Sequence, residues 1–298
     1  MSFVLSLIAA AFYSISSALL SRTLKVCNAQ GSGNAHWYVP GQPASNSQTQ
    51  DHRTLPDETE ITSRVARFHR LTLIFATAAV IIHGWIVINQ TGLPDGLTLP
   101  LFTSLSASTL TIALLHIALC LRQPADYLGL AVYPLAAVTL IVSQTSGGGT
   151  PIQGTAVQIH VMLSFISYGV LALAAAQAAL VATQRHFIAI HKPGGFVRAL
   201  PPLDTTERLL FSLLSAGFVL LSLALLSGFI YLDNMFDQRV AHKTVLSCAA
   251  WMVFGILLFG RWQFGWRGKK AVHLTLGGFA LLILAYFGTK TVIEFLVN

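Results

Sequence analysis

The sequence predicts an all-α fold, a polytopic membrane protein built as a bundle of eight transmembrane helices with both termini outside. The first observation is composition: of the 298 residues, 54% are hydrophobic and only 10% are charged, whereas about 25% of residues in soluble domains are charged. The second is a set of apolar segments near the roughly 20 residues that a helix needs to cross a bilayer. The third is that Lys and Arg gather in alternate connectors. No segment has the composition of a soluble domain, so we expect a single membrane domain over residues 1–298.

The apolar runs give the predicted spans: 2–20, 69–89, 99–121, 127–144, 158–184, 208–232, 243–262 and 271–295. We expect the first span to be retained, because Arg22 and Lys25 follow it and no basic residue precedes it, the reverse of a signal peptide. Residues 22–68 are rich in Gly, Ser, Asn, Gln and Pro, which predicts a flexible loop with little apolar surface to bury. The short connector 122–126 forces the spans on either side of it to be antiparallel neighbours.

Lys and Arg are distributed unevenly between the two sides of the predicted membrane. The first, third, fifth and seventh connectors carry fifteen of them, while the other connectors and the C-terminal end carry Arg239, Lys243 and Lys290. Because cytoplasmic loops collect Lys and Arg, the side with fifteen is cytoplasmic, and so is the loop at 22–68. The net charge of +7 therefore reflects membrane orientation. We expect the lipid bilayer as a partner, and no nucleic acid.

The span 158–184 has a histidine, His160, in its first turn at the outer face. Small and hydroxylated residues recur after it near helical spacing, which allows one face to lie close to other helices: Ser164, Ser167, Tyr168, Ala172, Ala175 and Ala176. His160 has two interpretations. It lies at the water interface, where an imidazole costs little, or it faces a ligand or a metal.

Two further histidines are expected in the outer half of the membrane. His83 lies within the span 69–89, and His242 opens the span 243–262. Ionisable groups inside a span are costly and often functional, although a neutral imidazole hydrogen-bonded to a neighbouring helix also explains His83. Imidazole is a common axial ligand of haem iron, so two such groups facing each other across a bundle would hold a haem. His160, His242 and His83 are therefore the candidate cofactor-binding residues.

The sequence lacks the residues that several classes of protein need. Cys27, Cys120 and Cys248 form no CxxC pair and no Cys/His finger, so neither a disulfide framework nor a structural zinc site is expected. Apart from Glu294, near the C-terminal end, no span carries the mid-depth carboxylate that cation-coupled transporters usually have. The sequence contains no P-loop, GxSxG or HExxH motif. We therefore expect no catalytic residues, no metal site and no enzyme activity.

Three blocks of the sequence are informative together: HVMLSFISYGVLALAAAQAAL (160–180), WMVFGILLFGRWQFGWRGKKAV (251–272) and LGGFALLILAYFGTK (276–290). In this order they resemble the cytochrome c assembly protein family, haem-handling membrane proteins that include CcsA and CcmC. The resemblance is closest to the inner-membrane YpjD subgroup, also called CorE. It extends to the N-terminal helices and to PPLDTTERLLF (201–211).

The resemblance implies a multi-pass protein of the bacterial cytoplasmic (inner) membrane that binds or handles haem in cytochrome c biogenesis. It implies haem as the cofactor and cytochrome c assembly components as partners. In CcsA-like proteins the histidine that opens the first block is an outer-face haem ligand, and His160 matches it by position. The family's tryptophan-rich external motif and its two other haem-contacting histidines have no counterpart here. The alternative is a membrane scaffold or regulator without haem, related to the cobalt or magnesium tolerance that the CorE name implies.

Overall fold

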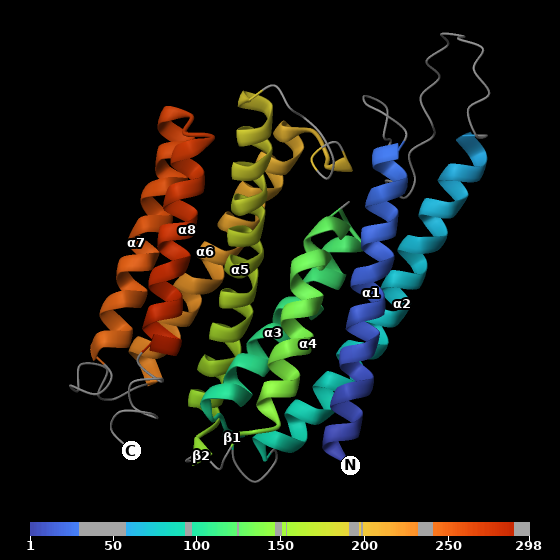
Figure 1. The fold of residues 1–298 in the computed structure, drawn as a ribbon. Helices are drawn as coiled ribbons and strands as arrows, with labels where there is room; N and C mark the ends of the chain where they lie inside the picture. Colours follow the sequence, from blue (N-terminus) through green and yellow to red (C-terminus); the bar gives the residue numbers. More distant parts are fainter. Residues whose placement is uncertain are drawn as a thin grey trace.

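The computed structural model describes residues 1–29, 58–92, 97–123, 125–146, 151–152, 154–190, 197, 199–231 and 241–288. Within these residues, 8 helices are long and apolar enough to cross a membrane, and they stand together as a bundle (Figure 1). Their bounds are α1 Ser2–Ala29, α2 Glu58–Thr91, α3 Leu101–Cys120, α4 Gly129–Ser143, α5 Thr155–Ala189, α6 Leu203–Tyr231, α7 Ala241–Phe264 and α8 Lys269–Ile283. The predicted all-α membrane fold is confirmed.

Short elements accompany these helices in the described part of the chain. The 3-10 helix η1 (Asp126–Leu128) leads into α4, and the π-helix η3 (Leu284–Gly288) continues α8. Two strands, β1 (Leu97–Thr98) and β2 (Pro151–Ile152), form an antiparallel ladder of two residues each. The ladder joins the connectors that precede α3 and α5 at one end of the bundle, which we call the ladder end (Figure 1).

The helices on either side of the first connector are longer than the sequence predicts. α1 continues to Ala29 and α2 begins at Glu58, so residues 22–29 and 58–68, expected to lie in the flexible loop, are helical. Neither stretch contains the helix breakers Gly or Pro, α1 and α2 pack on each other, and Leu24 is buried in the core. The packing of α1 on α2 thus extends both helices beyond the apolar runs. The middle of the predicted loop, residues 30–57, lies outside the described residues.

Other differences from the predicted spans concern α5, α6 and α8. α5 has 35 residues, about 52 Å at 1.5 Å per residue, so it extends beyond a hydrocarbon core of about 30 Å. α6 begins at Leu203, five residues before the predicted span, and Asp204 lies in its first turn. The last predicted span, 271–295, corresponds to α8 and η3 as far as Gly288, and residues 289–298 lie outside the described part.

The helices form two neighbouring groups. In the first group, α1 and α3 each pack on α2 and α4; in the second, α5 and α7 each pack on α6 and α8. The contact between α3 and α5 joins the two groups, which stand side by side in Figure 1. The packing of α3 on α4 confirms the prediction drawn from the short connector between them.

Two glycines allow α5 to approach its neighbours closely. A Cβ on Gly169 would lie 2.8 Å from Leu115 Cδ1 of α3, and a Cβ on Gly217 of α6 would lie 2.6 Å from Leu171 Cδ2 of α5. Such small residues bring membrane helices close enough for extensive van der Waals contact. The small-residue face predicted for residues 158–184 therefore does pack on neighbouring helices.

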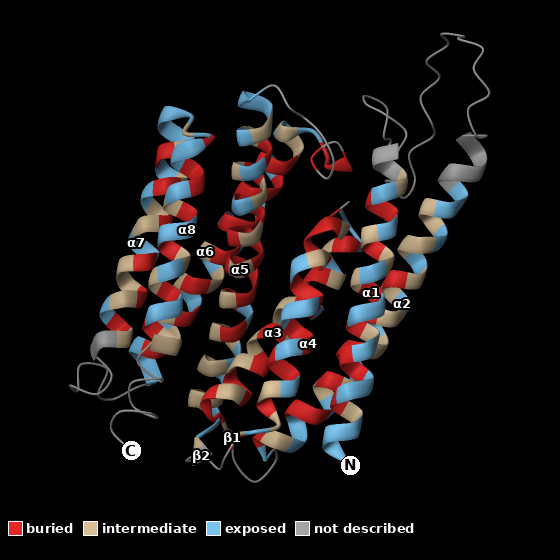
Figure 2. Cartoon of the chain, viewed as in Figure 1, coloured by how far each residue is buried: buried red, intermediate tan, exposed pale blue. Residues whose placement is uncertain are grey.

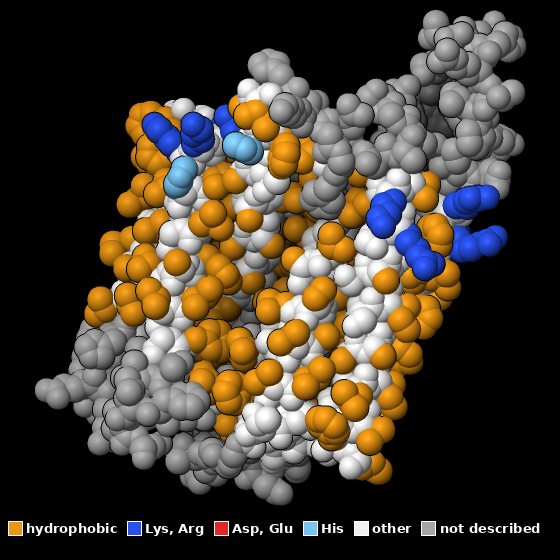
Figure 3. Space-filling view, viewed as in Figure 1, with side chains coloured by type: hydrophobic (Ala, Val, Ile, Leu, Met, Phe, Trp, Pro, Cys, Tyr) orange, Lys and Arg blue, Asp and Glu red, His pale blue; other side chains and the backbone are white. Residues whose placement is uncertain are grey.

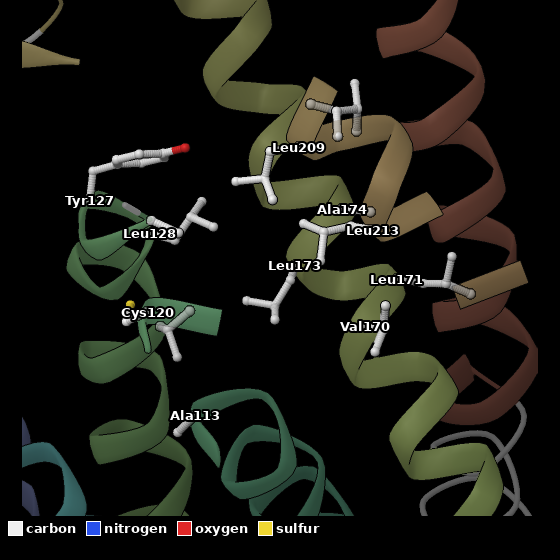
Figure 4. Packing of buried hydrophobic residues seen from close by; sticks show 14 of the residues in the cluster. Ala113, Cys120, Tyr127, Leu128, Val170, Leu171, Leu173, Ala174, Leu209 and Leu213 are labelled. Carbon is white, nitrogen blue, oxygen red and sulfur yellow. The ribbon is translucent and has the colours of Figure 1, made fainter. Parts of the chain in front are cut away.

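Apolar side chains of both groups fill the centre of the bundle. The cluster in Figure 4 joins α3 and η1 on one side to α5 and α6 on the other: Ala113, Cys120, Tyr127, Leu128, Val170, Leu171, Leu173, Ala174, Leu209 and Leu213. Cys120 is buried here as a small packing residue, as its place in an apolar span predicts. Buried residues alternate with exposed ones along each helix (Figure 2). The exposed large apolar residues, among them Ile81, Val138 and Ile256, suit contact with lipid tails.

Basic residues gather at the end of the bundle opposite the ladder (Figure 3), which we call the basic end. The described Lys and Arg there are Arg22, Lys25, Arg64, Arg67, Arg70, Arg122, Arg185, Arg208, Arg261, Arg267, Lys269 and Lys270. Among the described residues, only Lys243 at the start of α7 lies toward the other end. The positive-inside rule assigns the basic end to the cytoplasm and the ladder end, where Met1 lies (Figure 1), to the outside.

Candidate functional site

His160 is the sixth residue of α5, about 8 Å along the helix from its start at the ladder end. The side chain is half-buried, and its Nδ1 lies 2.9 Å from the Ser227 Oγ of α6. Ser227 Oγ donates its proton to the Ala224 carbonyl oxygen at 2.8 Å. When Ser227 donates to Ala224, its oxygen accepts a proton from His160 Nδ1, because a hydroxyl has one proton to donate. In that tautomer Nε2 keeps a lone pair that can bind a metal.

Aromatic side chains and one ammonium group lie near the ladder ends of α5, α7 and η3. The Tyr286 ring contacts the rings of Phe165 and Tyr168, with centroid distances of 6.1 and 6.4 Å. The Lys243 Nζ lies 6.0 Å from the centroid of the Tyr286 ring. The sequence did not predict Phe165 or Tyr286 as part of a site, although Tyr168 belongs to the predicted packing face and Lys243 is one of the three basic residues expected outside. The ladder end of the second helix group thus has packed aromatic rings and a positive charge at the same end of the bundle as His160.

His242 is the second residue of α7 and precedes Lys243 directly. Its backbone lies at the same end of the bundle as the start of α5 and the end of α6 (Figure 1), and α7 packs on α6. Its side chain lies outside the described part of the structure. The prediction that His242 binds a cofactor is therefore untested by this structure and stays a prediction.

His83 lies in the first helix group and is fully buried. Its Nδ1 lies 3.2 Å from the Tyr13 hydroxyl of α1, and its Nε2 lies 2.8 Å from the Ser106 hydroxyl of α3. Both ring nitrogens thus have hydrogen-bond partners, and none of these contacts involves α5 or α6. The structure does not bring His83 together with His160. Its role as a haem ligand stays a prediction, beside the alternative of a hydrogen-bonded imidazole.

A second buried imidazole, His116, is bonded in the same manner. Its Nδ1 lies 3.2 Å from the Tyr133 hydroxyl, and its Nε2 lies 3.2 Å from the Ala125 carbonyl oxygen. The ring of Tyr133 stacks on that of Tyr13, with a centroid distance of 5.8 Å. These contacts tie α1, α3, α4 and the connector before η1 together inside the first group.

A polar cluster between α5 and α6 at the basic end was also missed. Thr206 donates to Gln184 Oε1 at 2.8 Å, and Gln177 donates to the Thr206 carbonyl oxygen at 2.9 Å. Beside them, Glu207 pairs with Arg185 at 3.3 Å, and the Glu207 side chain is only 8% exposed. Glu207 is the fifth residue of α6, and its burial against α5 was not predicted from the sequence. The cluster fixes two helices and presents no open ligand.

The described residues contain no group of three or more His, Cys, Asp or Glu that could hold a metal ion. His160 is half-buried, unlike the buried His83 and His116, and its Nδ1 has a hydrogen-bond partner. At the basic end, the exposed His273 of α8 is similar, with its Nδ1 2.7 Å from the Lys269 carbonyl oxygen.

Comparison with known proteins identifies the family. The family model described as "Cytochrome C assembly protein" matches residues 84–297, which is most of the chain. The chain belongs to the cytochrome c assembly protein family. No solved structure matches it significantly.

Three relatives are similar to this chain over different lengths. "Inner membrane protein YpjD" of Escherichia coli (strain K12) is 32% identical over 231 residues, covering 76% of this chain and 87% of that protein. An "Uncharacterized 28.8 kDa protein" of Azospirillum brasilense is 34% identical over 153 residues, covering 51% of this chain and 56% of the relative. "Cytochrome c biogenesis protein CcsA" of Prochlorococcus marinus (strain NATL1A) is 27% identical over 101 residues, covering 32% of each.

The match to an inner membrane protein and the eight helices long enough to span a bilayer agree with each other. This member of the cytochrome c assembly family is a multi-pass protein of the bacterial inner membrane, as predicted.

Proposed function

We propose that this chain binds haem at the ladder end of α5–α8 and handles it in cytochrome c biogenesis, without catalysing a reaction. The observation that carries the proposal is the contact between His160 Nδ1 and Ser227 Oγ at 2.9 Å. Metal-binding histidines almost always donate their other ring N–H to a protein group, which fixes the tautomer and the ring orientation. Ser227 is such a partner for His160 Nδ1, and His160 Nε2 would bind the haem iron.

The surrounding residues fit haem chemically. When bound, haem supplies an iron that accepts imidazole ligands. It also carries two propionate carboxylates. His242 would supply a second ligand to the haem iron, because its backbone lies at the same end of the bundle (Figure 1). The ammonium of Lys243 is proposed to pair with a propionate. His83 is the weaker candidate, because a ligand role would require it to give up its bond to Tyr13 or Ser106.

The link to cytochrome c biogenesis comes from the relatives. Family membership and the printed name of the Prochlorococcus relative support haem and cytochrome c assembly components as partners. The alternative, a scaffold or regulator for cobalt or magnesium tolerance, has no specific support among the described residues, since they hold no group suited to a metal ion.

An absorption spectrum of the protein, purified in mild detergent after haem supplementation, tests the proposal. The unmodified protein should show a Soret band. His160→Ala should lower the haem content at equal protein level, because it removes the axial ligand. The matched control is His186→Ala, an exposed histidine in the last turn of the same helix at the basic end, which should keep its haem. Absence of a Soret band from the unmodified protein, or equal haem in both variants, would contradict the proposal.

A further inference from the structure

The basic end has an open groove between α6 and α7, far along the bundle from His160. Its volume is about 670 Å³, and its lining includes Phe211 and Ser215 of α6, Leu258, Arg261 and Trp262 of α7, and Arg267 of the turn that follows. The groove therefore combines an apolar floor, one hydroxyl group and two guanidinium groups.

The arginine charges in this groove are only partly neutralised. Arg261 stacks on Phe211, with its Cζ 4.6 Å from the ring centroid, and the structure shows no carboxylate partner for it in the described part of the chain. Arg267 Nη1 is 3.9 Å from Asp204 Oδ1, but the other Asp204 oxygen already pairs with Arg208 at 2.7 Å. Asp204 thus pairs with both Arg208 and Arg267, while Arg261 has no carboxylate partner among the described residues. Together, Asp204 and the three arginines carry a net charge of +2.

Aromatic and apolar surface continues from the groove along α7 toward the membrane centre. Trp262, in the last turn of α7, is 80% exposed, and Trp is enriched where helices leave a bilayer. Phe259, Ile256 and Met252 follow at spacings of three and four residues, so they form one stripe on the helix, and all three are exposed. The groove thus lies at interface depth, with a lipid-facing stripe leading away from it.

We propose that this groove binds the head group of an anionic phospholipid. The phosphodiester pairs with Arg261 and Arg267, Ser215 donates a hydrogen bond to the head group, and the acyl chains lie along the apolar stripe of α7. Guanidinium groups are well suited to phosphate because they donate two parallel hydrogen bonds. Basic pockets between helices on the cytoplasmic side are known sites for such head groups. A free phosphate ion would gain nothing from the apolar floor and the stripe, which is why the charge and the apolar surface together favour a lipid.

Native mass spectrometry of the detergent-purified full chain tests this site. The protein is incubated with phosphatidylglycerol or with phosphatidylcholine of the same acyl chains, and the bound lipid is counted. We expect preferential binding of phosphatidylglycerol and a loss of that preference by about tenfold in R261Q/R267Q. The matched control is R67Q/R70Q, which removes two charges from exposed arginines of α2 at the same end and should keep the preference.

A second variant guards against misfolding of the arginine variant. Ser215→Glu retains both arginines and adds a carboxylate that repels phosphate, so it should also lose the preference. An unchanged preference in both groove variants would overturn the proposal, as would displacement of the lipid by millimolar inorganic phosphate, which would show a simple phosphate site. Loss of haem from R261Q/R267Q without any change in lipid binding would overturn it too, because the arginines would then hold the propionates of haem.

Discussion

His160 Nδ1 of α5 and Ser227 Oγ of α6 lie 2.9 Å apart, and this contact between two helices sets the state of the imidazole. Ser227 is itself bonded to the Ala224 carbonyl within α6, so α6 fixes the ring orientation of a residue on α5. The same two helices approach closely at Gly217, where a Cβ would lie 2.6 Å from Leu171. Close packing of α5 on α6 thus holds the proposed iron ligand in place.

Ser227→Ala should lower haem affinity by about tenfold, toward the lower end of the effect usually seen when the hydrogen-bond partner of a metal ligand is removed. The ring would keep Nε2 but lose its fixed orientation. Haem titration followed at the Soret band measures the change. Ser164→Ala is the matched control, because Ser164 donates to the His160 carbonyl oxygen within α5 and does not contact the ring. An equal loss in both variants would show that orientation by Ser227 is unimportant.

The bundle itself was predictable from the sequence because membrane insertion depends on local composition. Each of the eight spans is a continuous apolar run, and the positive-inside rule needs only the counts of Lys and Arg in the connectors. Adjacent helices were predictable where a connector is short, as for α3 and α4. The ends of α1, α2 and α5 were not, because packing against a neighbour stabilises helical turns whose own composition is polar.

The partners of the candidate histidines were beyond the reach of the sequence. Tyr13 lies 70 residues from His83, and Ser227 lies 67 residues from His160. Such pairs depend on which helices become neighbours and on their rotation about their axes, and no periodic pattern encodes either. The burial of Glu207 could not be predicted for the same reason, since its partner Arg185 comes from another helix.

His83→Ala should destabilise the protein by about 1–3 kcal/mol, because it leaves the buried hydroxyls of Tyr13 and Ser106 without a partner. Thermal unfolding in detergent measures the effect. Haem content per folded protein should stay unchanged, since neither hydrogen-bond partner belongs to α5 or α6. A variant as stable as the unmodified protein but depleted of haem to the level of His160→Ala would instead make His83 a ligand.

Gly169→Ala should lower the thermal unfolding midpoint, because the new Cβ would lie 2.8 Å from Leu115 and 3.3 Å from Thr111 of α3. This is the contact that joins the two helix groups, and overpacking of this kind costs about 1–3 kcal/mol. Gly277→Ala is the matched control: its Cβ meets nothing within 4 Å, so improved helix propensity should leave the midpoint unchanged or raise it. Equal midpoints in the two variants would contradict the tight contact.

Lys243→Gln should weaken haem binding, and Lys243→Arg should restore most of it, because the proposed role of this residue is to place a positive charge near a propionate. Haem titration at two salt concentrations checks the charge, since screening should reduce the difference between the unmodified protein and Lys243→Gln. Lys269→Gln removes a charge at the opposite end of the bundle and should have no effect. Equal affinities in Lys243→Gln and Lys243→Arg would mean that the charge is irrelevant.

The orientation of the bundle is tested by fusing a reporter that is active only in the cytoplasm. Fusions after Arg122, Lys192 or Lys270 should give signal, because these residues lie in the connectors on the side with most of the Lys and Arg. Fusions after Gly148 or Asp237 should be silent. The connector that contains Gly148 has no Lys or Arg, so nothing in its charge would hold it in the cytoplasm. Signal at Gly148 would show that the bundle has the opposite orientation in the membrane, with His160 at the cytoplasmic face.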